Sequence, residues 1–470
     1  MPHPTIVSGG MGIYAFPWLP VSEVAKLGLG IVSGTGMHIV LSRLLQLGDQ
    51  GGHFRRALKA FPDKDLAMRI LDRYYVSEGI PSNKPFKNIE QFSLNPSREL
   101  IELTIVANFC QVWLAKEGHQ GKVGVNFLEK LQMPHLYSIY GILLAEADYL
   151  IMGAGIPMQI SAVLDKLIKH EEATYNIHVI GTDKSMIYQM KFNPRNFLQC
   201  SLSELKRPYF FPKISSSTLA QIMTRSEEHI IDGWVVELSS AGGHSMSPRG
   251  KALWTASGEP IYGKKDEIDF NLLNSIGLPY YMAGGYASPE MYAQARSLGA
   301  IGILVGSPFA LSDDSTIDPD LRIYIRKEAY NGRLIVFNDA HASPTGFPFK
   351  VVHMPRTLGD IRTYLKRKRI CDLGGLLQPY LRSDGSVGYR CPAEPTSSYC
   401  KKGGKKEDTV YKMCLCNGLF GTVGLGQRLK SGTTEPPVVT LGQNLDFLRH
   451  LMSDENDGYS IKDVFDYLLS

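Results

Sequence analysis

Short apolar runs that end in Gly, Ser or Asn alternate along the chain with segments whose apolar residues recur every three or four positions. The first pattern is typical of buried parallel strands and the second of amphipathic helices, so together they predict repeated βα units. We expect a closed (β/α)8 TIM barrel, because the alternative, a doubly wound open sheet, usually has fewer strands. Eight runs are predicted as its strands: 5–10, 29–36, 122–127, 148–155, 208–215, 233–240, 279–285 and 301–307.

Two regions depart from the βα alternation. Residues 47–121 carry mainly helical patterns, which predicts a helical insertion between the second and third strands. Beyond residue 355 the alternation stops, and the sequence becomes rich in Gly, Pro and Cys. We therefore expect a barrel over residues 1–355 and an irregular C-terminal extension, 356–470, packed on it.

Composition narrows the class of protein. Of the 470 residues 44% are hydrophobic and 20% charged, which is ordinary for a globular chain, and the net charge of +4 is too small to favour nucleic acid or an anionic membrane as partner. The most apolar long stretch, 137–158, is interrupted by Glu146 and Asp148, and the N-terminus lacks the pattern of a secretion signal. We expect a soluble, cytoplasmic protein.

Glycine-rich loops follow the last two predicted strands. Gly284 and Gly285 precede Ser288, which is predicted to cap a helix, and Gly306 and Ser307 follow the next strand. Such loops expose backbone N–H groups, and phosphate sites of barrels commonly lie between the seventh and eighth strands. A single glycine pair would more often make only a tight turn, but two such loops at adjacent strand ends favour a phosphate site.

Other strand ends carry groups that suit a flat cofactor. Gly10, Met11 and Gly12 form a loop that lets a ring approach the backbone closely. The amide of Asn126 both donates and accepts hydrogen bonds, and a lysine such as Lys213 would stabilise negative charge on a reduced flavin. Considered alone, Asn126 is more typical of a turn residue and Lys213 of a surface residue. Because both are predicted at the ends of strands of the same barrel, together they favour a flavin site.

The segment 235–246, "VVELSSAGGHSM", ends an apolar run with two glycines and a histidine. Gly242 and Gly243 lack Cβ atoms, so His244 would be placed across a flat ligand. A histidine exchanges a proton near neutral pH, which makes His244 the predicted catalytic residue. The alternative is a structural histidine in a loop, and His135 is a second, weaker candidate.

Several motifs together resemble the nitronate monooxygenase family, formerly called 2-nitropropane dioxygenases. They are "IVSGGMG", "GWVVELSSAGGHSM" and "YYMAGGYASPEMYAQARSLGAIGILVGSPFALSDDS", and the similarity covers most of residues 1–350 outside the helical insertion. The resemblance implies a TIM barrel with non-covalent FMN that oxidises alkyl nitronates with O2 and without a metal. It places the proposed catalytic base on His244, and the cofactor-binding groups on Asn126, Lys213, Gly284, Gly285, Gly306 and Ser307.

The chain departs from that family at several positions. Ser240 occupies the position of a glutamate in the family, and Ser307 occupies the position of a threonine. The segment 343–350 lacks the arginines that the family has there. The stretch "AGGHSMSPRG", with Arg249, is similar to the trans-acting FMN enoyl reductases of polyketide and polyunsaturated fatty acid synthases. The alternative function is therefore NAD(P)H-driven reduction of an enoyl thioester on an acyl carrier protein.

A third hypothesis is a non-catalytic barrel that binds a phosphorylated ligand or serves as an assembly subunit through its C-terminal extension. In the preferred function the partners are a small-molecule substrate and O2, with no nucleic acid and no membrane. In the alternative function, enoyl reduction, the partners would include NAD(P)H or an acyl carrier protein, and O2 would not be needed.

The cysteines gather near the C-terminus, where five of the seven lie. Cys391, Cys400, Cys414 and Cys416 would suffice for zinc, but the two-residue knuckle spacing of most structural zinc sites is absent, and "CLC" suits a single tetrahedral ion poorly. We therefore predict reduced thiols packed as small hydrophobic groups and no metal site.

Overall fold

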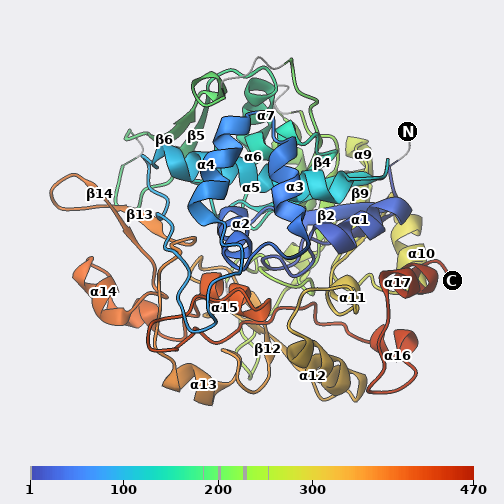
Figure 1. Cartoon of the computed structure of the whole chain (residues 1–470). Helices are drawn as coiled ribbons and strands as arrows, with labels where there is room; N and C mark the ends of the chain where they lie inside the picture. Colours follow the sequence, from blue (N-terminus) through green and yellow to red (C-terminus); the bar gives the residue numbers. More distant parts are fainter. Residues whose placement is uncertain (1–2, 184, 199–202, 226–229, 252) are drawn as a thin grey trace.

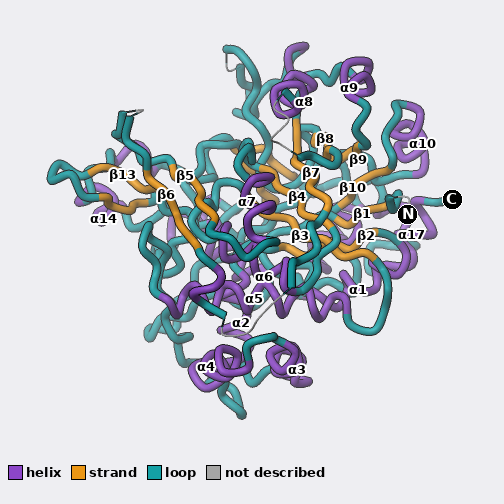
Figure 2. Tube along the Cα trace, turned by 90° about the horizontal axis from the view of Figure 1, so that it is seen from above, coloured by secondary structure: helices purple, strands orange, loops and turns teal. Residues whose placement is uncertain are grey.

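The computed structural model describes residues 3–470 except 184, 199–202, 226–229 and 252. Its centre is a closed barrel of parallel strands, in the order β1-β10-β9-β8-β7-β4-β3-β2 (Figure 2). The predicted TIM barrel is confirmed, and each of the eight predicted strands is present. Their bounds are β1 Ile6–Ser8, β2 Leu29–Ser33, β3 Lys122–Leu128, β4 Tyr149–Gly153, β7 Tyr209–Ile214, β8 Trp234–Glu237, β9 Tyr280–Ala283 and β10 Gly302–Val305.

Alternate residues of these strands fill the barrel interior. Ile31, Ile151, Phe211, Val235 and Tyr281 belong to one buried cluster there, so the barrel is a packed core and not a pore. The opposite faces pack against the surrounding helices, which is why the strands are apolar on both sides. The interior positions at the carboxyl ends of the strands are thereby left to face the barrel mouth.

Helices of the βα units surround the barrel. They start where the sequence supplies capping side chains: Ser216 and Ser288, for example, each accept a backbone hydrogen bond from the third residue beyond them, Leu219 and Met291. Their bounds are α1 Trp18–Leu27, α2 Met37–Gln46, α5 Arg98–Lys116, α6 His135–Leu144, α7 Ile160–Leu167, α8 Ser217–Thr224, α9 Phe270–Ile276, α10 Pro289–Ser297, α11 Ser307–Ala310 and α12 Pro319–Tyr330.

The region 47–121 is helical, as predicted. Besides α5 it contains α3 (His53–Ala60) and α4 (Lys64–Tyr74), which contact α5 and α2 and so add a layer outside the barrel's own helices (Figure 2). The loop after α4 returns toward the C-terminal segments: the backbone N–H of Phe86 donates to Gln427 Oε1.

Two antiparallel hairpins lie outside the predicted pattern. β5 (Ala173–Ile177) pairs with β6 (Tyr188–Phe192) between β4 and β7, and β11 (Ile335–Asp339) pairs with β12 (Phe349–His353) after the last barrel strand. β5 alternates buried and exposed residues, as a half-buried strand does, and such a short alternation was not distinguished from loop in the sequence.

The segment 356–470 is more regular than predicted. It contains α13 Ile361–Lys366, β13 Gln378–Leu381, β14 Val387–Arg390, α14 Thr396–Lys401, α15 Leu415–Thr422, α16 Leu448–Leu451 and α17 Ile461–Leu468. Several of these helices are short, so their periodicity is weak, and their stability comes from packing. α17 contacts α1, α10 and α11, whereas β13, β14 and α14 lie at the opposite side of the molecule (Figure 1). The division into two domains at residue 355 stays a prediction.

In the part of the chain that the structure describes, no helix is both long enough and apolar enough to span a bilayer.

Candidate functional site

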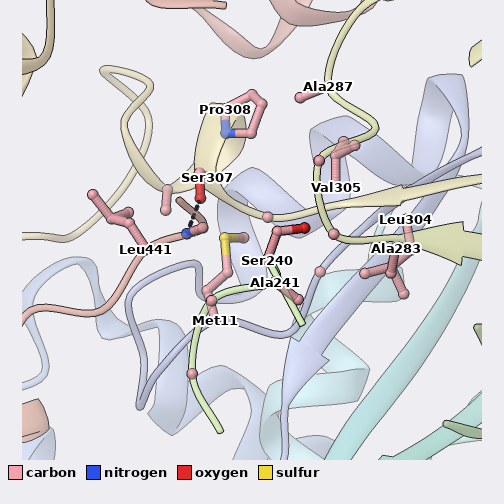
Figure 3. Close-up of a pocket in the computed structure, with 18 of the residues that line it drawn as sticks. Met11, Ser240, Ala241, Ala283, Ala287, Leu304, Val305, Ser307, Pro308 and Leu441 are labelled. Atoms are coloured by element: carbon pink, nitrogen blue, oxygen red, sulfur yellow. Dashed lines mark hydrogen bonds between the residues drawn. The ribbon is translucent and has the colours of Figure 1, made fainter. Parts of the chain in front are cut away.

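A cavity of about 790 Å³ lies at the carboxyl ends of β1, β8, β9 and β10 (Figure 3). Glycine-rich backbone from several loops forms much of its wall. The structure brings ten of the predicted site residues to this cavity: Gly10, Met11, Gly12, Lys213, Gly242, Gly243, Gly284, Gly285, Gly306 and Ser307.

The two remaining predicted residues line an adjoining cavity of about 830 Å³. Asn126 and His244 contribute to its wall, and it shares Gly10, Lys213 and Gly242 with the first cavity. The predicted residues therefore line one continuous space at the barrel mouth, although their roles stay predictions.

One end of this space is built from tight backbone turns. Gly284 (φ +89°) and Gly285 (φ +81°) adopt the left-handed conformation that favours glycine, and a Cβ on Gly284 would lie 2.9 Å from the carbonyl oxygen of Leu238. The turn leads into α10. On the other side Ser307 Oγ accepts a hydrogen bond of 2.8 Å from the N–H of Gly442, drawn as the dashed line in Figure 3. This end offers backbone dipoles and a helix N-terminus with little side-chain bulk, which suits a phosphate.

The same cavity carries charged side chains that come from the top layer of the barrel interior. Lys213 lies two residues after the interior Phe211, and Glu237 two residues after the interior Val235, so both side chains point into the mouth. Lys213 Nζ lies 2.5 Å from Glu237 Oε1, and the two side chains are 15% and 17% exposed. Gly153 makes room for the lysine, since a Cβ there would lie 2.5 Å from Lys213 Cδ.

The Asn126 side chain packs against the backbone of Gly10, where a Cβ would lie 2.5 Å from Asn126 Cβ. Among the described residues its buried Oδ1 atom has no hydrogen-bond partner. A buried acceptor without a partner is costly, so this atom is suited to receive a donor from a ligand in the cavity.

His244 lines the adjoining cavity. Its Nε2 atom is 2.7 Å from Ser343 Oγ, and its ring makes an edge contact with Phe349, with 4.8 Å between the centroids. Burial lowers the pKa of His244 to about 4, because the charged imidazolium is poorly solvated there. At neutral pH the imidazole is therefore uncharged and offers one donor and one acceptor nitrogen.

The second histidine candidate lies elsewhere. His135 begins α6, and its Nε2 atom is 3.1 Å from the backbone oxygen of Glu129. Burial lowers its pKa to about 4. It lines a third, mainly apolar cavity and is not brought to His244.

That third cavity has a volume of about 900 Å³ and joins the mouth. Phe127, Leu131 and Cys416 line both it and the cavity of His244. Its other walls come from α2, from the connection between β3 and α6, and also from the helical insertion and the C-terminal segments, which contribute Phe92, Leu373 and Phe420. An apolar chamber thus extends from the site between two regions that are additions to the barrel.

Several wall residues were not predicted. The segment 440–447 crosses the mouth: the N–H of Gly243 donates to Thr440 Oγ1 at 2.8 Å, and that of Gln443 donates to the oxygen of Ser240 at 3.0 Å. The only sequence feature that could have indicated this segment was the glycine of "TLGQN", which is remote from any predicted strand end. Glu237 was missed as well, although it lies in a predicted strand.

The segment 343–350 contains no arginine, but its last residue, Lys350, is a basic residue. Lys350 is fully buried, and its Nζ donates to the oxygen of Ser239 at 2.5 Å. Burial lowers the pKa of Lys350 to about 8. Arg249, in contrast, is exposed, and its backbone N–H donates to Asp266 at 2.9 Å, outside the cavities.

No protein-family model matches the chain, and no curated protein matches it. Solved structures do. They include FabK from Thermotoga maritima (16% identity, TM-score 0.46, 99% of this chain and 91% of that chain covered) and nitroalkane oxidase from Streptomyces ansochromogenes (11%, 0.44, 98% and 94%). Another is the enoyl reductase domain of MlnA from the macrolactin biosynthesis cluster of Bacillus amyloliquefaciens (12%, 0.48, 99% and 93%). At these values the likeness carries no argument about function, which has to come from the site.

Proposed function

We propose that the barrel mouth binds FMN non-covalently and that the protein is an FMN-dependent oxidoreductase. One observation carries this proposal: glycine-rich turns from β1, β8, β9 and β10 line a single cavity that Lys213 and Glu237 also line. A flat ring needs walls without side chains, and a phosphate needs free backbone N–H groups.

The residues present fit the two ends of FMN. Gly284, Gly285, Gly306 and Ser307 would hold the phosphate, and Lys213 would lie beside the ring. The buried Oδ1 of Asn126 would accept a hydrogen bond from a ring N–H, which would satisfy it. When bound, FMN supplies hydride transfer, and Lys213 would offset the negative charge of its reduced form.

A matched pair of glycine variants tests cofactor binding. Gly285 and Gly277 both have positive φ, of 81° and 78°, but only Gly285 lines the cavity. A Cβ on Gly285 would contact only Ser240 Oγ, at 3.4 Å, and one on Gly277 would contact nothing within 4 Å. Gly285→Asp places a carboxylate at the phosphate end and should weaken FMN binding by about 100-fold or more. Gly277→Asp carries similar backbone strain and should bind as the wild type does.

The measurement is the flavin absorbance and FMN content of the purified proteins, followed by titration of the apoprotein with FMN. Wild-type protein that is colourless and takes up no FMN would contradict the proposal and favour a barrel that binds another phosphorylated ligand.

The apolar chamber bears on the choice between the two predicted reactions. The walls of the chamber are mainly aromatic and aliphatic, so a long alkyl chain would cover more apolar surface there than a small alkyl nitronate would. We propose on this ground that the chain reduces an enoyl thioester with NAD(P)H, the acyl chain lying in the chamber. Nitronate oxidation with O2 remains the second candidate, supported by the resemblance of the motifs.

The chain's own residues have definable tasks in this reaction. The cavity walls hold the acyl chain so that its double bond lies between His244 and the ring site. The uncharged imidazole, oriented by Ser343, would donate a hydrogen bond to the thioester carbonyl and increase the polarity of the adjacent double bond. The segment 440–447 would exclude water from the reacting face.

Anaerobic reduction separates the two reactions. Mixing the protein with NADPH should bleach its flavin colour rapidly, and a long-chain enoyl thioester should then restore it. Rapid bleaching by propyl-3-nitronate together with no response to NADPH would overturn the reductase proposal and leave the oxidation in its place.

A further inference from the structure

Four cysteines from three separate segments line one small cavity of about 300 Å³ in the C-terminal part of the chain. Cys371 follows α13, Cys391 follows β14, and Cys414 and Cys416 lie at the start of α15. The set differs from the one considered in the sequence: Cys371 belongs to it, whereas Cys400 is exposed and does not line the cavity.

The backbone comes close to one of these thiols at Gly375, where a Cβ would lie 3.1 Å from Cys416 Sγ. Close backbone of this kind can present N–H groups to sulfur, and hydrogen bonds to sulfur are a regular feature of metal–sulfur centres.

The four thiols face one small space, so thiolates there would repel one another unless a cationic metal lay between them. The N-terminus of α15, where two of the cysteines lie, favours negative charge as well.

A single metal ion does not fit this arrangement. Tetrahedral zinc requires sulfurs about 3.8 Å apart, given a Zn–S distance of about 2.3 Å, and no group of three or more His, Cys, Asp or Glu among the described residues is arranged to hold one ion. Cysteines that gather around a cavity without closing on one point are what a larger inorganic core requires. In an iron–sulfur cluster each thiolate binds its own corner of the core, and the thiolates stay further apart than around one ion.

We propose that Cys371, Cys391, Cys414 and Cys416 bind an iron–sulfur cluster. It would join the loop after α13, the end of the β13–β14 hairpin and the start of α15 at one point. Cys416 also lines the cavity of His244, with Leu376 and Leu415 between the two spaces, so the cluster would lie against the wall of the proposed flavin site.

The test is a metal and sulfide analysis of the full chain, purified without oxygen and, in a second sample, reconstituted with ferrous iron and sulfide. We expect iron and acid-labile sulfide in equal amounts, about two or about four of each per chain. Cys371→Ser and Cys416→Ser should lower the iron content by about tenfold or more, and Cys400→Ser, the matched exposed control, should leave it unchanged.

The metal and sulfide content of the wild-type protein tests the proposal even if a variant fails to fold. Zinc without sulfide, or no iron after reconstitution, would overturn the proposal, and so would iron that persists in both Cys371→Ser and Cys416→Ser. FMN is quantified separately in the same samples, because the cluster proposal does not rest on flavin binding. A protein without FMN would contradict the proposed function alone, and a protein without iron would contradict the cluster alone.

Discussion

Lys213→Met is expected to lower turnover by about 10²–10³-fold. The variant removes the positive charge that faces the cavity from β7, where the ammonium lies 2.5 Å from Glu237 Oε1. If Lys213 stabilises charge that develops during the reaction, the loss falls on kcat, and FMN is still bound through the glycine turns. Lys213→Arg keeps the charge and should retain most of the activity. Steady-state kinetics and the flavin reduction potential are the measurements.

The control for this prediction is the double variant Lys213→Met/Glu237→Gln. The single variant leaves the Glu237 carboxylate, only 17% exposed, without its cation, which by itself destabilises the protein. The double variant removes both charges and so relieves that defect. Activity that returns in the double variant would show that the unpaired glutamate, and not the missing lysine, caused the loss.

His244→Ala should lower kcat/KM with an enoyl thioester by about 10²–10⁴-fold while the FMN content stays constant. The ring lines a cavity that Lys213 also lines, and burial lowers its pKa to about 4, which keeps it uncharged at neutral pH. The contribution of His244 should accordingly be constant across neutral pH and fall as the pH drops toward 4, where the imidazole gains a proton. The variant should lose this acid limb of the pH profile.

His341→Ala is the matched control, since His341 lies two residues from Ser343 but is exposed. It should behave as the wild type does. If His244→Ala kept full turnover with both an enoyl thioester and a neutral nitroalkane, the imidazole would have no part in either reaction. Ser343→Ala should give an intermediate loss, because it removes the group that orients the ring.

The barrel was predictable from the sequence because its strands are buried on both faces. Residues 234–236 and 302–305 are apolar and buried, because a parallel strand lies between the surrounding helices and the barrel core. The site followed from the fold: once the strand ends were located, Lys213, His244 and the glycine turns had to meet at one end of the barrel.

What was missed depends on contacts between distant parts of the chain. Thr440 and Gly442 bind the turns of Gly243 and Ser307, and no local pattern marks that pairing. The four-cysteine cavity was missed for the same reason: the sequence analysis grouped Cys400 with Cys391, Cys414 and Cys416, whereas the fold brings Cys371 to these three. The β5–β6 hairpin alternates over only five residues per strand, too few to separate it from loop.

The hydrogen bond between Gly442 and Ser307 has a consequence for biogenesis. A ribosome delivers residues in order from the N-terminus, so all eight barrel strands emerge before the segment that crosses their mouth. Until translation passes residue 442 the mouth lacks one wall, and any ligand held there would exchange freely with solvent. Stable retention of a prosthetic group is therefore expected only after nearly the whole polypeptide has been synthesised.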